Sequence, residues 1–166
     1  MQLSMEGERL LKAHDYEGAI EFFEAGLRVG TDDKEILSAI YNQLGNACFY
    51  VGKFHKALEY HKKDLEIAEQ LGDRQGMAKA YGNLGNTFKA LKNYTNAVKC
   101  CENHLDITRE LGDKLGEGRA CYNLGNVYHA IGKAKLSKRE QTVSERREFF
   151  FLICFFFSFL FTLDES

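Results

Sequence analysis

Side chains able to do acid–base or metal chemistry occur in this chain of 166 residues, but they do not gather into a motif. His104 lies close to Asp106, with no nucleophile or orienting group in the same stretch. His55 and His61 are spaced so that they fall on different faces of a helix, which disfavours a metal pair. We therefore predict a protein that is not an enzyme and that has no catalytic residues, no metal and no cofactor.

Amide side chains, in contrast, recur at a spacing of 40 residues. They form two series, Gln43, Asn83 and Asn123, and then Asn46, Asn86 and Asn126. A carboxamide carries both a hydrogen-bond donor and an acceptor, so a row of them can pair with the backbone of an extended peptide. At steps of three and four residues the same helix faces carry Lys79, Lys89, Arg119 and His129. Because a guanidinium binds a carboxylate through two parallel hydrogen bonds, the whole set favours an acidic peptide.

The spacing of the amides belongs to a longer internal repeat. Leu-Gly-Asn occurs at residues 44–46, 84–86 and 124–126, each time 40 residues further along the chain. The flanks repeat as well, because Glu-Gln-Leu-Gly-Asp at 69–73 matches Arg-Glu-Leu-Gly-Asp at 109–113. Three matched segments at one period predict a stack of similar structural units.

Each unit has the pattern of a helical hairpin. Apolar residues at steps of three and four predict one helix over 38–51, ended by Gly52, and a second over 54–71, closed by Gly72. Gly132 occupies the position of Gly52 in the last copy. We expect it to end the matching helix there.

Glycine also recurs inside the first helix of each unit. Gly45 lies in the middle of its helix, where glycine costs about 1 kcal/mol relative to alanine. A glycine repeated at that cost usually permits two helices to approach closely. We expect its neighbour to be Ala57, a small residue on the paired helix.

The predicted fold class is therefore all-α, an α-solenoid of about three and a half helical hairpins within residues 1–133. The predicted repeats fall at about 1–35, 36–73 and 76–113, with a half repeat at 116–133, followed by a basic polar segment at 134–148 and a Phe-rich apolar tail at 149–166. A stack of this kind exposes the first helix of each hairpin on a concave face. The amide rows and the cations are predicted to line a groove on that face.

Several motifs within these units resemble a known family. An aromatic-x-x-Leu-Gly at residues 41–45, followed by Ala57, is similar to the tetratricopeptide repeat. The 40-residue period is longer than the usual one, and with Gly-Asn-Leu-Gly-Asn at 82–86 it resembles the variant found in LGN and Pins, the G-protein-signalling modulators. Glu-Gly-Glu-Arg-Leu at 6–10 resembles the opening of that family, and the likeness covers about residues 3–133.

The resemblance implies a peptide-binding scaffold that acts in spindle orientation, cell polarity, asymmetric cell division and signal transduction. It implies a groove for acidic extended segments, Inscuteable-like or NuMA/Mud-like, and a place in the cytoplasm and at the cell cortex. Members of the family also carry C-terminal GoLoco motifs that bind Gα. This chain has nothing similar to those motifs, so Gα binding is not expected.

Charge and cysteine usage exclude other classes. The chain has 22 Lys and Arg against 24 Asp and Glu, a net charge of −2, which disfavours nucleic-acid binding because that needs a concentrated basic surface. The five cysteines are odd in number and form no C-x-x-C motif. A reducing compartment such as the cytoplasm therefore fits better than a secreted disulfide scaffold.

The tail leaves three interpretations open. Eight of the 13 Phe lie within residues 149–161, and the apolar run 149–163 follows a basic segment. It has the pattern of a short membrane anchor, which makes a membrane-tethered tetratricopeptide-repeat adaptor the alternative function. It could also dock as the missing second helix of the last hairpin. Its low complexity equally fits a retained intron, an alternative transcript or a gene-model error.

Overall fold

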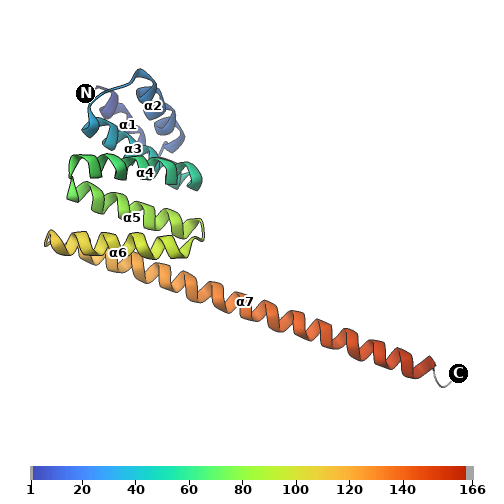
Figure 1. The fold of residues 1–166 in the computed structure, drawn as a ribbon. Helices are drawn as coiled ribbons and strands as arrows, with labels where there is room; N and C mark the ends of the chain where they lie inside the picture. The colour runs from blue at the N-terminus through green and yellow to red at the C-terminus, as the bar shows by residue number, and fades with distance from the viewer. Residues whose placement is uncertain (1, 164–166) are drawn as a thin grey trace. The chain divides into compact units, whose positions relative to one another are not determined.

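The computed structural model describes the backbone of residues 2–163 and the side chains of residues 6–142. All regular structure in this part of the chain is helical, as predicted (Figure 1). The helices are α1 Gln2–Lys12, α2 Tyr16–Val29, α3 Lys34–Tyr50, α4 Phe54–Leu71, α5 Arg74–Ala90, α6 Tyr94–Glu110 and α7 Lys114–Leu163. The chain divides into two compact units, residues 1–128 and 129–166.

In the first unit consecutive helices pack as antiparallel neighbours and form a stack (Figure 1). The predicted helix 54–71 coincides with α4, and the one predicted at 38–51 corresponds to α3, which begins four residues earlier. This earlier start has a local cause, because the Asp33 carboxylate caps α3 by accepting from the backbone N–H groups of Glu35 and Ile36. The predicted α-solenoid of helical hairpins is therefore confirmed.

The corners between helices repeat their backbone geometry. Gly52 has φ of 78°, and Gly72 and Gly112 both have φ of 66°, so each helix ends in the left-handed conformation that glycine tolerates. In the third repeat Lys92 takes this role with φ of 59°. The next residue, Asn93, is occupied as the N-cap of α6 and accepts a hydrogen bond from the Asn96 N–H.

The core confirms a close helix approach at Gly45, but the predicted neighbour is wrong. A Cβ at residue 45 would overlap the imidazole of His61, which is 1% exposed. Ala57 is fully buried one turn away on α4. A ring, and not a methyl group, therefore occupies the space that the missing side chain leaves.

The prediction that Gly132 ends a helix is also wrong. The helix α7 continues through Gly132 to Leu163, and Gly132 is absent from the positive-φ glycines of the chain. In the earlier repeats an aromatic residue, Phe54 or Tyr94, begins a new helix after the corner. The matching residue here is Ala134, whose neighbours are good helix formers, so nothing in the local sequence interrupts the helix.

The predicted tail lies outside the residues whose side chains are described. Within the described residues, the structure contains no helix with the length and apolar character needed to span a membrane. The proposed boundaries at 133 and 148, and the three interpretations of residues 149–163, stay predictions.

Candidate peptide-binding groove

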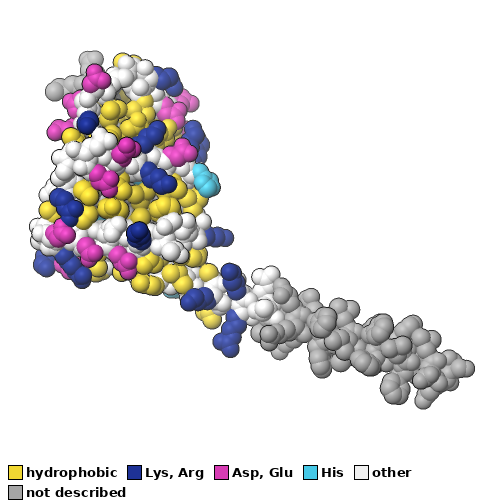
Figure 2. All heavy atoms as spheres, in the orientation of Figure 1, with side chains coloured by type: hydrophobic (Ala, Val, Ile, Leu, Met, Phe, Trp, Pro, Cys, Tyr) yellow, Lys and Arg dark blue, Asp and Glu magenta, His cyan; other side chains and the backbone are white. Residues whose placement is uncertain are grey.

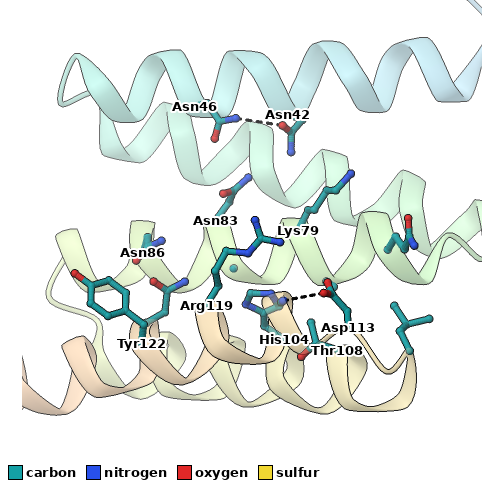
Figure 3. A pocket seen from close by; sticks show the side chains of 16 residues that line it. Asn42, Asn46, Lys79, Asn83, Asn86, His104, Thr108, Asp113, Arg119 and Tyr122 are labelled. Atoms are coloured by element: carbon teal, nitrogen blue, oxygen red, sulfur yellow. Dashed lines mark hydrogen bonds between the residues drawn. The ribbon is translucent and has the colours of Figure 1, made fainter.

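A cleft of about 670 Å³ opens in the first compact unit, on the side where α3, α5 and α7 lie (Figure 3). Its lining residues are Asn42 and Asn46 from α3, Gln75, Ala78, Lys79, Gly82, Asn83 and Asn86 from α5, His104 and Thr108 from α6, Leu111 and Asp113 from the following corner, and Gly116, Arg119, Tyr122 and Asn123 from α7. The first helices of the second, third and last repeats, α3, α5 and α7, thus contribute amides to one shared cleft.

Six of the ten predicted groove residues line this cleft. They are Asn46, Lys79, Asn83, Asn86, Arg119 and Asn123. Lys89 and Asn126 are not among the lining residues, and His129 belongs to the second compact unit. Gln43 lines a separate apolar hollow of about 480 Å³ beside α1 and α2.

The prediction missed Asn42, which lies on the cleft one helical turn before Asn46. The signal was present, because a spacing of four residues places two side chains on one helix face. The amide series pointed to Gln43 instead, since Gln43 shares its repeat position with Asn83 and Asn123. The 40-residue register therefore identified the helix but not the side chain that faces the cleft.

On the α3 wall, a chain of hydrogen bonds leads from the core to the cleft. Asp64 of α4 is 3% exposed and accepts from Ser38 Oγ at 2.6 Å and from Asn42 Nδ2 at 2.9 Å. Asn46 Nδ2 in turn donates to Asn42 Oδ1 at 3.2 Å, which Figure 3 shows as a dashed line. Burial raises the pKa of Asp64, and the hydrogen bonds from Ser38 and Asn42 act against this rise.

The α5 wall presents Lys79, Asn83 and Asn86 on one helical stripe. Gly82 lies on the same face, and a Cβ at this position would lie 3.1 Å from the His104 ring, so the ring is close to the helix backbone. His104 is 7% exposed, and its Nδ1 has no hydrogen-bond partner. Burial, and secondly the Arg119 charge, lower the pKa of His104, so the neutral form is favoured at this end of the cleft.

The α7 wall adds an exposed cation and an aromatic ring. Figure 3 shows Lys79 extending from α5 and Arg119 from α7, with Tyr122 at one end of the cleft. Tyr122 is 72% exposed, so its ring is available for contact. Asp113 is engaged already, because its Oδ1 accepts from the Gly116 N–H at 2.9 Å and caps α7.

The charge of the cleft is therefore local and positive. Its lining contains two cations, Lys79 and Arg119, and one carboxylate, the helix cap Asp113. Elsewhere on the stack, basic and acidic side chains are interspersed over the face that Figure 2 shows. The whole chain has a net charge of −2, but the cleft is locally positive and suits an anionic, hydrogen-bonding ligand.

The described residues contain no cluster of three or more His, Cys, Asp or Glu side chains able to hold an ion. His55 and His61 in particular do not combine, since His55 is exposed while His61 is buried against Gly45.

Comparison with known proteins places the chain in a family. Models of the tetratricopeptide repeat match residues 40–75 and 76–139, together more than half of the sequence. The chain belongs to the tetratricopeptide-repeat family.

Its repeat region is similar to that of G-protein-signaling modulator 1. The identity is 58% over 78 residues for the human protein and 57% over 78 residues for the mouse protein, which is 47% of this chain and 12% of either relative. The predicted resemblance to the G-protein-signalling modulators is confirmed over this stretch. Human Tetratricopeptide repeat protein 28 is 32% identical over 74 residues, 45% of this chain and 3% of that protein.

Solved structures share the fold at low sequence identity. BtubC (BKLC) from P. vanneervenii aligns with a TM-score of 0.71 and 24% identity over 78% of this chain and 55% of its own. The first TPR of Spaghetti (RPAP3), bound to the HSP90 peptide SRMEEVD, aligns with a TM-score of 0.63 and 19% identity over 78% of this chain and 90% of its own. These matches support the solenoid fold alone.

Proposed function

We propose that the chain is a non-catalytic scaffold whose cleft holds an acidic, extended segment of a partner protein. The observation that carries the proposal is that two cations, Lys79 and Arg119, line the same cleft as six carboxamide side chains. The two cations suit the carboxylates of such a segment, and the amides suit its backbone groups.

The comparisons support this proposal from outside the chain. The Spaghetti (RPAP3) structure holds SRMEEVD, a peptide that contains three acidic residues, on a similar stack of helices. The likeness to G-protein-signaling modulator 1 supports a role in G-protein signalling. By the same resemblance we propose Inscuteable-like or NuMA/Mud-like segments as partners, spindle orientation and cell polarity as the setting, and the cytoplasm and cell cortex as the location.

The proposal is tested by fluorescence polarisation with the full chain. The probe is a short fluorescein-labelled peptide that repeats Glu, Ala and Ser, and its competitor has Gln in place of Glu. We expect the Glu peptide to bind and the Gln peptide to compete poorly. Asn86→Ala combined with Arg119→Glu should weaken binding about tenfold or more, because a charge-assisted contact and an amide contact are lost together.

A matched control comes from predicted residues that do not line the cleft. Lys89→Glu combined with Asn126→Ala changes the same charge and the same kind of amide. We expect this variant to bind the probe as the unaltered chain does. Equal weakening by both double variants would show that general charge, and not the cleft, attracts the peptide, and would refute the proposal.

A further inference from the structure

Behind the α3 wall of the cleft, one acidic side chain, Asp64 of α4, lies in the core and is not itself a lining residue. Asp64 is 3% exposed, yet both of its carboxylate oxygens accept hydrogen bonds, from Ser38 and from Asn42. A buried carboxylate is costly unless such donors satisfy it. The two donors come from α3 and the carboxylate from α4. These hydrogen bonds therefore hold the Ser38 and Asn42 side chains in place and also link the two helices.

The carboxylate determines which way the Asn42 carboxamide is turned. Asp64 accepts only, so Asn42 must present its Nδ2 to Asp64 Oδ2. Its Oδ1 then points along α3, where it accepts from Asn46 Nδ2 at 3.2 Å. The orientation of the Asn42 carboxamide therefore fixes that of the Asn46 carboxamide, one helical turn further along α3.

Asn46, the last residue of the hydrogen-bonded chain that runs from Asp64 through Asn42, lies on the cleft with one polar atom left for a ligand. Asn46 is half-buried and uses its Nδ2 toward Asn42, so its Oδ1 is the acceptor that the series leaves unused. In an extended peptide, a backbone N–H can donate to this acceptor, and such N–H groups recur at a fixed spacing along the peptide.

We propose that Asp64 is a positioning residue of the groove, which acts through Asn42 to hold the Asn46 Oδ1 toward the cleft as an acceptor for a backbone N–H of the bound peptide. The inference rests on the proposed function and assigns different parts of the bound peptide to different residues of the groove. The α3 wall recognises the backbone of the peptide through this acceptor, while Lys79 and Arg119 recognise its acidic side chains.

The next repeat supplies an internal reference for this arrangement. Residues 40 further on are Ala78 for Ser38, Gly82 for Asn42, Asn86 for Asn46 and His104 for Asp64. Asn86 therefore has the same helix position as Asn46 and lines the same cleft, but it has no amide at residue 82 to receive its N–H group. Orientation by a buried carboxylate belongs to the α3 wall and not to the α5 wall.

The first test leaves the sequence unaltered and needs no peptide. Side-chain amide protons of the full chain are assigned by NMR, and their exchange with solvent is measured at neutral pH. We expect the Nδ2 protons of Asn42 and Asn46 to exchange more slowly than those of Asn86, because only the former donate within the series. Exchange of Asn46 as fast as that of Asn86 would overturn the proposal.

The second test is a double-mutant cycle on binding of the fluorescein-labelled Glu peptide. Asn46→Ala and Asp64→Ala should each weaken binding about fivefold, the effect of one neutral hydrogen bond. If Asp64 acts through Asn46, the combined variant should bind no more weakly than Asn46→Ala alone. Asp64→Ala combined with Arg119→Ala should instead multiply the two separate losses, since these residues serve different parts of the peptide.

The controls separate this inference from the proposed function. Glu66→Ala removes an exposed acid from the same helix and should leave binding unchanged, and circular dichroism shows whether each variant is folded. Multiplicative losses for Asp64→Ala and Asn46→Ala would refute the positioning role while the groove stands. Absence of peptide binding by the unaltered chain would refute the proposed function, and the exchange test would still decide whether the series orients Asn46.

Discussion

The third repeat and the start of α7 carry the same motif in different surroundings. In the hairpin of α5 and α6, Leu84 is 3% exposed and Gly85 lies against Cys101 and Ala97 of the paired helix. In α7, Leu124 is only half-buried, and a Cβ at Gly125 would meet nothing within 4 Å. The Leu-Gly-Asn motif alone therefore does not define a buried contact.

The exposed aromatic residues follow the same contrast. Phe88 in α5 is half-buried, whereas its counterpart Tyr128 in α7 is 53% exposed. One side of α7 is covered, since Ala120 and Val127 are 0% and 1% exposed. In α7 one face of the Leu-Gly-Asn segment is packed and the other is largely open. The same substitution should therefore have a different effect in α7 than in a complete hairpin.

The largest difference is expected for the leucines. Leu44→Ala should lower the free energy of unfolding by about 2–5 kcal/mol, because a fully buried side chain is replaced by a cavity. Leu124→Ala should cost about 1 kcal/mol, because that leucine is already partly exposed and leaves little cavity. Chemical denaturation followed by circular dichroism measures both values, and equal losses would contradict the contrast.

The second difference concerns acid sensitivity in a complete hairpin. Burial lowers the pKa of His61 to about 4 from its ordinary value of 6.5. The unfolded chain therefore takes up a proton below pH 6.5, while the native chain resists until about pH 4. The stability that this histidine confers is complete above pH 6.5 and is lost as the pH falls toward 4, by about 3 kcal/mol in total.

The measurement compares the unaltered chain with His61→Leu across this pH range. We expect the difference in unfolding free energy between the two proteins to change by about 3 kcal/mol between pH 7 and pH 4. The other titratable groups are present in both proteins, so their contributions cancel in this difference. A difference that stays constant between pH 7 and pH 4 would show that His61 is not protected from protons as its burial indicates.

Glycine substitutions should change stability in opposite directions. Gly85→Ala would bring a Cβ within 2.8 Å of the Cys101 Sγ, so we expect a loss of about 1–3 kcal/mol from overpacking. Gly125→Ala meets no atom and gains up to about 1 kcal/mol in helix propensity. Thermal unfolding of the two variants checks the sign, and destabilisation by Gly125→Ala would mean that this face of α7 is covered in solution.

The smallest effect is expected for the ion pair that links α5 to α6. Arg74 and Glu110 form a salt bridge, but their side chains are 41% and 60% exposed. Exposed pairs of this kind contribute about 0.2–1 kcal/mol, so Arg74→Ala should lower the unfolding free energy by no more than this. A loss as large as that of Leu44→Ala would show that charge, and not the apolar interface, holds the complete hairpins together.

The period of the sequence predicted the stack because the corners and the buried positions repeat with it. Gly52 and Gly72 were predicted as helix ends from their residue type alone, and both have positive φ. Gly132 misled the same reasoning, because a glycine ends a helix only where the following residues support a new one. The three residues after Gly132 are Lys, Ala and Lys, which favour continuation of α7.

The site was harder to predict than the stack. Lys79, Asn83 and Arg119 were predicted because their helix positions recur, and all three line the cleft, although their part in binding stays a prediction. Asp64 could not be found in this way. It lies 26 residues from Ser38 on another helix, and its counterpart in the next repeat is His104, so neither spacing nor repetition marks it.

The corners at Gly72 and Gly112 also have a consequence for how such a chain can change in length. Both glycines have the same φ, and each precedes an aspartate that caps the next helix through the N–H of a glycine three residues on. A second copy of residues 73–112 inserted after Gly112 would therefore begin and end at junctions that the fold already uses. Unequal recombination at these two points could add a hairpin without requiring any new connecting loop.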